Sequence, residues 1–264
     1  VTLADFTAQA LICRLLKKLA PSIPIVAEET STLLRESSNQ AVASKILSIL
    51  DDEGYGHEFG SFDSLFSSID LGQNTPDDFF WTLDPIDGTK GFLRGEQYAI
   101  ALALIVNGEV ALAVIGCPRL HIEHDLSTKG FLFSAIRNKP SYRKNLQSGS
   151  VTVIGISNRD NPEHMRFVQS YESAHGNLPL QIRIADDLGF LQKPVQMDSQ
   201  VKYCAVACGL AEVYVRIPNP NRPDYREKIW DHAAGALIVQ QAGGWVSDIY
   251  GNPLDFSCGK TLLK

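Results

Sequence analysis

The sequence predicts a mixed α/β fold built in layers, and two observations support this prediction. Apolar runs typical of strands alternate with helical patterns along the chain, as in layered α/β proteins. The 264 residues, of which 44% are hydrophobic and 20% charged, can form one large domain or two modest ones. The same composition excludes a disordered chain.

The N-terminal part predicts helices around one short strand. Apolar residues recur at helical spacing over 2–20, and a strand is expected over 23–27. A second helix is expected over 40–50. Residues 51–78 are polar and contain several glycines, which predicts a long loop with one short helix over 61–69.

The middle of the chain predicts a set of strands. One covers 79–83 and ends at an Asp-Pro-Ile-Asp-Gly-Thr turn. Two more, over 98–106 and 109–116, are joined by Asn107-Gly108, a pair that favours a two-residue hairpin turn. A further strand is expected over 130–136.

The second half predicts alternating elements. Strands are expected over 151–156, 181–184, 212–217 and 245–248, and helices over 163–171, 202–208 and 232–241. The polar, basic stretch 140–149 is the expected boundary between an α+β half, residues 1–149, and an α/β half, residues 150–264.

Charge and hydropathy narrow the range of partners. The formal net charge is −6, which disfavours nucleic acid as a partner, and no apolar run is long enough to span a membrane. The chain begins with Val1 instead of Met, so we expect it to be a fragment. A cytoplasmic location is favoured, and an organellar form with a lost targeting peptide stays open.

Two carboxylates in one rigid turn are the first candidates for chemistry. Asp84 and Asp87 straddle a proline and precede Gly88. Carboxylates held this close repel each other unless a cation lies between them, and Mg²⁺ is bound by a few carboxylates together with substrate phosphate. An Asp-Pro turn with side-chain capping is the open alternative.

Other acidic residues have similar alternatives. Glu28 and Glu29 end a short strand, where they could converge with a second strand end or remain solvated. Asp231 precedes an apolar helix and could cap it. Asp5 follows Thr2 by three residues, which also reads as a capping box.

Four motifs together resemble a known family. Residues 81–98 read W-T-L-D-P-I-D-G-T-K-G-F-L-R-G-E-Q-Y, and 230–235 read W-D-H-A-A-G. With V-T-L-A-D at 1–5 and V-A-E-E at 26–29, they resemble, in order, the motifs of the lithium-sensitive, Mg²⁺-dependent phosphatases of the inositol monophosphatase superfamily. The run 90–98 is similar to the 3′(2′),5′-bisphosphate nucleotidase branch.

The resemblance implies a fold and a set of residue roles. The implied fold is the layered α-β-α-β-α sandwich of the sugar phosphatases. The implied ligands of two or three Mg²⁺ ions are Glu28, Asp84, the carbonyl of Ile86, Asp87 and Asp231. Asp5 and Thr89 would activate the attacking water, and Glu29 would support the metal-bound waters. The implied substrate contacts are Gly88, Thr89, His175, Ser199, Lys202, Arg216 and Asp231.

The resemblance also implies a reaction. We expect a phosphomonoester hydrolase that converts adenosine 3′,5′-bisphosphate to AMP and phosphate, with 3′-phosphoadenosine 5′-phosphosulfate as a second substrate. This would place the protein in sulfur metabolism, acting on a small nucleotide as a monomer or weak homodimer. An inositol phosphate phosphatase and a non-catalytic nucleotide-binding sensor stay open as alternatives.

Overall fold

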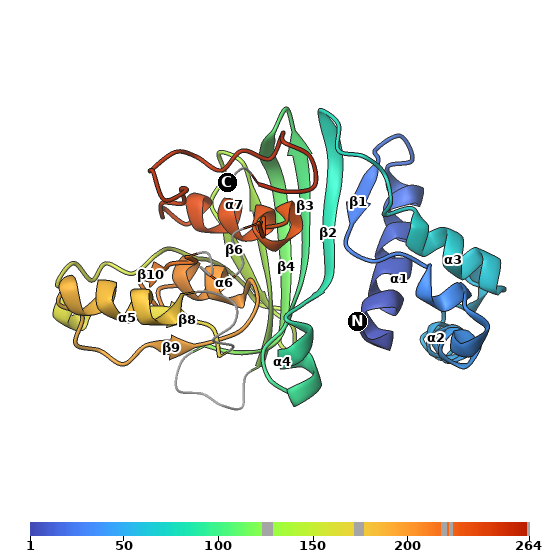
Figure 1. Ribbon diagram of the computed structural model, residues 1–264, viewed down its shortest axis with the longest axis horizontal. Helices are drawn as coiled ribbons and strands as arrows, with labels where there is room; N and C mark the ends of the chain where they lie inside the picture. Colours follow the sequence, from blue (N-terminus) through green and yellow to red (C-terminus); the bar gives the residue numbers. More distant parts are fainter. Residues whose placement is uncertain (123–128, 172–176, 218–220, 222–223, 263–264) are drawn as a thin grey trace.

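The computed structural model has layers in the order α-β-α-β-α, which confirms the predicted fold class (Figure 1). A group of N-terminal helices, a large sheet, a pair of helices, a small sheet and an outer helix follow one another across the molecule. The structure describes residues 1–122, 129–171, 177–217, 221 and 224–262.

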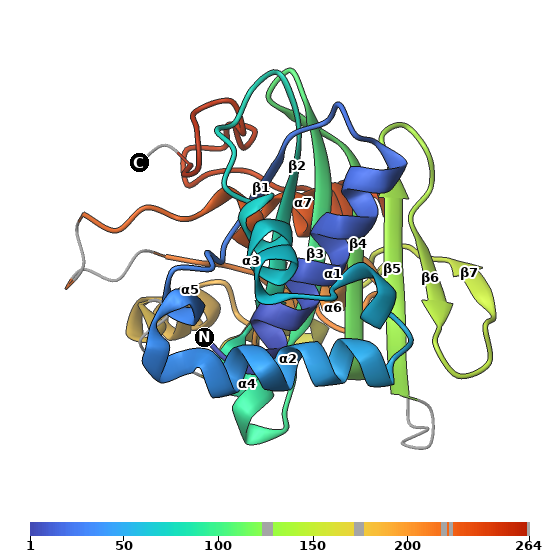
Figure 2. The same cartoon turned by 90° about the vertical axis from the view of Figure 1, so that its right-hand side faces the viewer.

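The first helical layer covers one face of the large sheet, as Figure 2 shows. Its helices are α1 (Leu3–Leu19), α2 (Gln40–Asp52) and α3 (Phe62–Asp70). All three were predicted. α1 packs against a strand of the sheet, while α2 and α3 bury their apolar faces against α1 and each other. The buried residues of this layer include Phe6, Ala10, Ile46, Leu65 and Ile69.

The large sheet has its described strands in chain order. They are β1 (Ile25–Ala27), β2 (Phe79–Asp87), β3 (Ala99–Val106), β4 (Glu109–His121), β5 (Lys129–Ile136), β6 (Tyr142–Asn145) and β7 (Val151–Val153). β1 runs parallel to β2, and each later pair is antiparallel. Asn107 and Gly108 have φ angles of 53° and 75°, which confirms the predicted hairpin turn between β3 and β4.

Two strands are longer than predicted: β4, expected over 109–116, continues to His121, and β2 continues beyond residue 83. The Asp-Pro-Ile-Asp segment does not end β2, which continues to Asp87 through an irregularity in its pairing with β3. Pro85 has no N–H to donate, but it lies within this irregularity, where the ladder is interrupted in any case.

The second helical layer covers the opposite face of the large sheet. It contains α6 (Val201–Ala207) and α7 (Ala233–Gln241), and α7 packs against β3, β4 and β5. α7 is buried along most of its length, which explains its nearly uniform apolar sequence. A short helix, α4 (Thr89–Arg94), follows β2 at the edge of the sheet.

The small sheet lies beyond α6 and is parallel throughout. Its order is β10 (Val213–Tyr214), β8 (Phe167–Gln169) and β9 (Val195–Gln196), and α5 (Leu178–Asp187) forms the outer layer (Figure 1).

Several predictions for this region are wrong. In place of the expected helix over 163–171 there is a 3₁₀ turn, Pro162–His164, followed by β8. Phe167 and Val168 are both buried in this strand. The expected strand over 181–184 belongs to α5, which begins at an Asn177 cap. Residues 245–248 form no strand, and Trp245 is exposed.

The large sheet continues across the expected boundary at residue 149. β6 and β7 pair on either side of it, and one hydrophobic core joins strands of the first half to helices of the second. The division into two halves stays a prediction. Among the described residues, none of the helices combines the length and apolar character that crossing a membrane requires.

Candidate active site

The carboxyl ends of β1 and β2 meet at one edge of the large sheet. The strands run parallel with Ala27 beside Leu83, so Glu28 and Asp84 are the next residues on neighbouring strands. The N–H of Glu28 donates to the carbonyl of Leu83 over 3.3 Å. The carboxyl groups of Glu28 and Asp84 are close enough that each affects the pKa of the other. This register brings two predicted metal ligands into contact.

A β-bulge sets the direction of the next acidic side chain. In a regular strand, residues three apart point to opposite faces of the sheet. Asp84 pairs with Ala101 and Asp87 with Ala99, so β2 advances three residues where β3 advances two. The extra residue lets both aspartates face the same region, and the charge of Asp87 helps to raise the pKa of Asp84, after burial.

Asp231 reaches this region from the other half of the chain. It ends a 3₁₀ helix, Ile229–Asp231, which packs against β2 and β3 and leads into α7. The cap position of α7 is His232, and within the described residues no side chain caps the helix there. The alternative that Asp231 serves as a helix cap is therefore wrong.

The converging carboxyl groups hold their protons more tightly than usual. Burial, followed by the charges of Glu29 and Asp231, raises the pKa of Glu28 to about 8. Burial and the charge of Asp87 raise the pKa of Asp231 to about 6. Burial also raises the pKa of Asp84 well above its ordinary value. Such shifts mark a place where a cation would stabilise the ionised groups.

The donor set suits a hard divalent cation. Oδ1 of Asp84 is buried and has no hydrogen-bond partner among the described residues. A buried carboxylate oxygen without a donor is costly unless a positive charge meets it. The carbonyl of Ile86 lies within the same bulge, 3.2 Å from the Thr89 hydroxyl. Carboxylate and carbonyl oxygens are the ligands that Mg²⁺ accepts from proteins.

Asp5 has two tasks. Its Oδ2 accepts hydrogen bonds of 2.6 Å from both the N–H and the hydroxyl of Thr2, which confirms the predicted capping box at the start of α1. Its Oδ1 accepts from the hydroxyl of Thr89 over 3.4 Å. The hydrogen bonds to Thr2 fix the carboxylate of Asp5 so that it faces Thr89, the first residue of α4.

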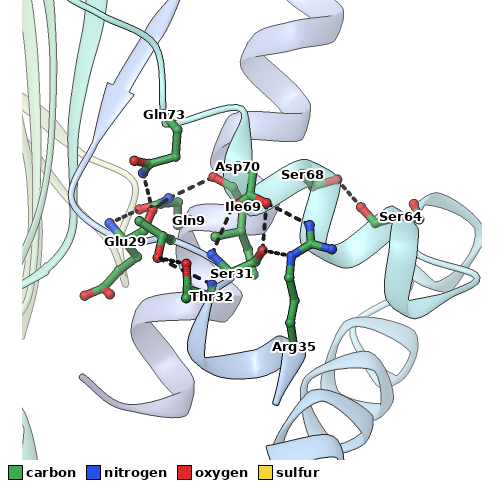
Figure 3. A network of polar contacts seen from close by, with 11 residues as sticks. Gln9, Glu29, Ser31, Thr32, Arg35, Ser64, Ser68, Ile69, Asp70 and Gln73 are labelled. Atoms are coloured by element: carbon green, nitrogen blue, oxygen red, sulfur yellow. Dashed lines mark hydrogen bonds and ion pairs between the residues drawn. The ribbon is translucent and has the colours of Figure 1, made fainter. Parts of the chain in front are cut away.

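Glu29 is held by its backbone and directs its carboxylate away from those contacts (Figure 3). The buried side chain of Gln9 bonds both the N–H and the carbonyl of Glu29. Burial, followed by the charge of Asp5, raises the pKa of the Glu29 carboxyl to about 7. Glu29 and Asp5 are therefore close enough for their charges to interact, and the supporting role of Glu29 stays a prediction.

Two of the predicted substrate residues, Ser199 and Lys202, lie beside the acidic cluster. Ser199 packs against Gly88, where a Cβ would come within 3.0 Å of the serine Cβ. Lys202 is 2% exposed, and its Nζ lies 5.3 Å from the centre of the Tyr214 ring. Burial raises the pKa of Asp87, and the charge of Lys202 opposes this shift. Lys202 therefore lies near the acidic cluster.

Arg216 forms an ion pair with Glu227. Its guanidinium contacts Glu227 through Nε at 2.9 Å and Nη2 at 2.8 Å. Glu227 also contacts Nε2 of His232 at 3.2 Å, and Nδ1 of His232 lies 2.7 Å from the Tyr203 hydroxyl. The charges of Lys202 and Arg216 both act on Asp87, and Arg216 is part of a chain of polar contacts. His175 lies outside the described residues.

Some residues of the site were not anticipated from the sequence. Donor atoms of Glu227, Asp231 and His232 lie within 4.8 Å of one another. Burial opposes ionisation of Glu227, but His232 and Arg216 keep its pKa below the usual value, so its charge is already compensated. Gln9 could have been noticed from its spacing, because it lies four residues after Asp5 on one helix face.

Comparisons with known proteins identify the family of the chain. The model of the inositol monophosphatase family matches residues 1–263. The chain is 41% identical to a 3′(2′),5′-bisphosphate nucleotidase of Schizosaccharomyces pombe, over 99% of this chain and 77% of the relative. It is 42% identical, with the same coverage, to a protein of that name from Oryza sativa.

Solved structures share the fold at lower identity. CysQ from Bacteroides thetaiotaomicron is 20% identical, with a TM-score of 0.54 over 98% of this chain and 94% of that one. The suppressor protein SuhB from Bartonella henselae is also 20% identical, with a TM-score of 0.61 over 94% of this chain and 73% of that one. From the family match and the identity to curated relatives, the chain belongs to the inositol monophosphatase family.

Proposed function

We propose that the protein is a phosphomonoester hydrolase that removes the 3′-phosphate of adenosine 3′,5′-bisphosphate, giving AMP and phosphate. Relatives at 41–42% identity over 99% of this chain carry the name 3′(2′),5′-bisphosphate nucleotidase. The structural observation that supports hydrolysis most directly is the Thr89 hydroxyl, 3.4 Å from a carboxylate oxygen of Asp5 beside the acidic cluster. 3′-Phosphoadenosine 5′-phosphosulfate is a second substrate of the same kind.

In this proposal the acidic cluster would hold two or three Mg²⁺ ions. Their ligands would be Glu28, Asp84, the carbonyl of Ile86, Asp87 and Asp231, and the unpartnered oxygen of Asp84 supports this set. When bound, the ions neutralise the phosphate dianion, lower the pKa of water and stabilise the leaving oxygen. The chain's own contribution is to hold these carboxylates on a bulged strand edge, so that little rearrangement is needed.

Asp5 and Thr89 orient and deprotonate the attacking water. A threonine hydroxyl is a poor base at neutral pH, so it needs an acceptor for its own proton. Oδ1 of Asp5 is that acceptor, and the cap formed with Thr2 holds the carboxylate in place. Water oxygen bonds to phosphorus, the bond from phosphorus to O3′ breaks, and O3′ takes up a proton. Glu29 supports the waters at the metal site.

In this proposal, Ser199, Lys202 and Arg216 bind the nucleotide. They supply a hydroxyl and two cations beside the acidic cluster. The uncleaved phosphate of the substrate is a dianion, and an arginine fork grips phosphate with two hydrogen bonds. Gly88 and Asp231 complete the phosphate environment, and His175 is the proposed adenosine contact. A monomer or weak homodimer in the cytoplasm stays a prediction.

A substrate panel tests this function. Phosphate release is measured from adenosine 3′,5′-bisphosphate, 3′-phosphoadenosine 5′-phosphosulfate and inositol 1-phosphate, with Mg²⁺ and with EDTA. We expect release from both nucleotides with Mg²⁺ and none with EDTA. Preferential release from inositol 1-phosphate would favour an inositol phosphate phosphatase. Binding of the nucleotides without phosphate release would identify a sensor.

A further inference from the structure

The side chain of Gln9 occupies an unusual position in the first helical layer. It is fully buried on α1, on a face whose other buried residues, apart from Asp5, are apolar. Its Nε2 donates to the carbonyl of Glu29 over 2.6 Å and to the carbonyl of Ile69 over 2.9 Å. Its Oε1 accepts from the N–H of Glu29 over 2.9 Å. Figure 3 shows this amide between the Glu29 turn and the end of α3.

The contacts with Glu29 imitate a strand partner. Residues paired in an antiparallel ladder exchange both an N–H and a carbonyl bond. β1 ends at Ala27, so Glu29 lies beyond the sheet ladder that holds the strand. The amide of Gln9 satisfies both backbone groups of Glu29 at this point, and therefore extends the fixed backbone past the end of the strand.

A second layer of contacts holds the same segment from outside. Nε2 of Gln73 donates to the Glu29 carbonyl over 2.7 Å. The N–H and hydroxyl of Ser31 donate to Asp70 over 2.9 and 2.7 Å, and Arg35 pairs with the same carboxylate (Figure 3). The turn after β1 is thus anchored to the end of α3 on both sides of Glu29.

We propose that Gln9, assisted by Gln73, is a positioning residue that fixes the Glu28–Glu29 turn for binding of divalent cations. Gln9 lies one helical turn after Asp5 on the same face of α1. One helix therefore places the proton acceptor of Thr89 and holds the backbone next to the metal ligand Glu28. This inference rests on the proposed function, because it concerns the same metal site.

A purely structural role for Gln9 makes a different prediction. If the amide only satisfies the Ile69 carbonyl inside the helical layer, its loss lowers stability and leaves cation affinity unchanged. If it positions Glu28 and Glu29, its loss weakens cation binding in protein that is still folded. Residues that orient metal ligands typically change affinity by about 10–100-fold when removed.

The test uses Gln9→Met, which keeps the length of the side chain and removes its polar atoms. Binding of Mn²⁺ to the full chain is followed by the electron paramagnetic resonance of the free ion. We expect the dissociation constant to rise by about 10-fold or more. The Mg²⁺ concentration for half-maximal phosphate release should rise in parallel, while kcat at saturating Mg²⁺ stays within about 3-fold of wild type.

Ile46→Val is the matched control, because it removes a buried methylene from the same helical layer without touching Glu29. Its Mn²⁺ affinity should equal that of wild type. Melting in EDTA identifies folded variants. If Gln9→Met does not fold, the exposed hydrogen bond from Gln73 to Glu29 is tested instead. Gln73→Leu should weaken Mn²⁺ binding by about 2–3-fold, since it removes one of three bonds to the Glu29 backbone.

Unchanged Mn²⁺ affinity in folded Gln9→Met overturns the inference. If Gln9→Met does not fold, unchanged Mn²⁺ affinity in Gln73→Leu overturns it. A weakening of the same size in Ile46→Val overturns it as well, because general loosening would then explain the result. The Mn²⁺ measurement needs no substrate. Wild-type protein that binds Mn²⁺ but releases no phosphate would contradict the proposed function and still allow the positioning role to be judged.

Discussion

The two sides of the site are built in different ways. On the cation side, Glu28, Asp84 and Asp87 lie on or directly after paired strands, and their directions follow from ladder register and a bulge. On the substrate side, Lys202 lies on a seven-residue helix and Arg216 follows a two-residue strand. Side-chain contacts such as the ion pair of Arg216 with Glu227 set their positions.

This difference suggests that the cation side carries out the hydrolysis and the substrate side determines which substrate is accepted. Backbone ladders give the carboxylates a fixed geometry that would serve any phosphomonoester. Side-chain contacts on short elements can change with few substitutions, which suits the part of a site that chooses among substrates. Changes on the cation side should therefore abolish turnover of every substrate, whereas changes on the substrate side should alter the ranking of substrates.

The largest effect is expected from Asp84→Asn. A neutral amide would be a much weaker ligand for Mg²⁺ than the carboxylate, so turnover of every substrate should fall below a tenth of wild type at saturating Mg²⁺. The fold should survive, because the change removes one of several crowded carboxylates, and its melting temperature in EDTA should not fall. More than a tenth of wild-type activity would contradict the role of Asp84 as a metal ligand.

A smaller effect is expected from Thr89→Val. The loss of a positioned proton acceptor should lower kcat by about 10²–10⁴-fold, with a lesser change in KM. Thr82→Val is a matched control, since the buried Thr82 hydroxyl has no hydrogen-bond partner among the described residues. Steady-state kinetics on both variants separates the roles. A Thr89→Val enzyme that loses affinity and keeps kcat would make Thr89 structural.

Substrate-side changes should act on one substrate class. Arg216→Lys keeps the charge and loses the two-pronged grip, so kcat/KM for adenosine 3′,5′-bisphosphate should fall by about 10-fold, or ~1.4 kcal/mol. Lys202→Met should have a similar effect. A substrate with one phosphate should be nearly unaffected by either change. Arg183→Lys, on the exposed face of α5, is the control. Equal losses for both substrates would place Arg216 at the reacting phosphate.

The smallest effect concerns pH and stability without metal. The pKa values of Glu28, Glu29 and Asp231 are raised to about 8, about 7 and about 6. The folded protein therefore keeps protons that the unfolded chain has released. The free energy of unfolding should then decrease as pH rises from about 4.5 to 8. Melting in EDTA should show this decrease, and Mg²⁺ should reduce it by binding the ionised groups. A melting temperature in EDTA that rises over this interval would contradict the buried cluster.

Sequence patterns were sufficient where local signals are strong. The Asn107-Gly108 turn, the cap at Thr2 and the apolar period of α1 each depend on neighbouring residues, and all three are present. The convergence of Glu28 with Asp84 depends on strand register, which the sequence indicates only through the resemblance.

Other features depend on distant parts of the chain. The alternation of Ile182 and Ile184 imitates a strand, but an Asn177 cap and packing beyond the small sheet make this segment a helix. β8 is buried between two other short strands, so its conformation depends on residues far along the chain. The pairing of Glu227 with Arg216 likewise involves side chains that only the fold brings together.

In the proposed function the acidic cluster acts on the 3′-phosphate while the substrate side holds the rest of the nucleotide. Chromatography of the nucleotide formed from adenosine 3′,5′-bisphosphate with Mg²⁺ tests this division most directly. We expect adenosine 5′-monophosphate and an equal amount of phosphate. Formation of adenosine 3′-monophosphate, or the absence of any new nucleotide, would contradict it.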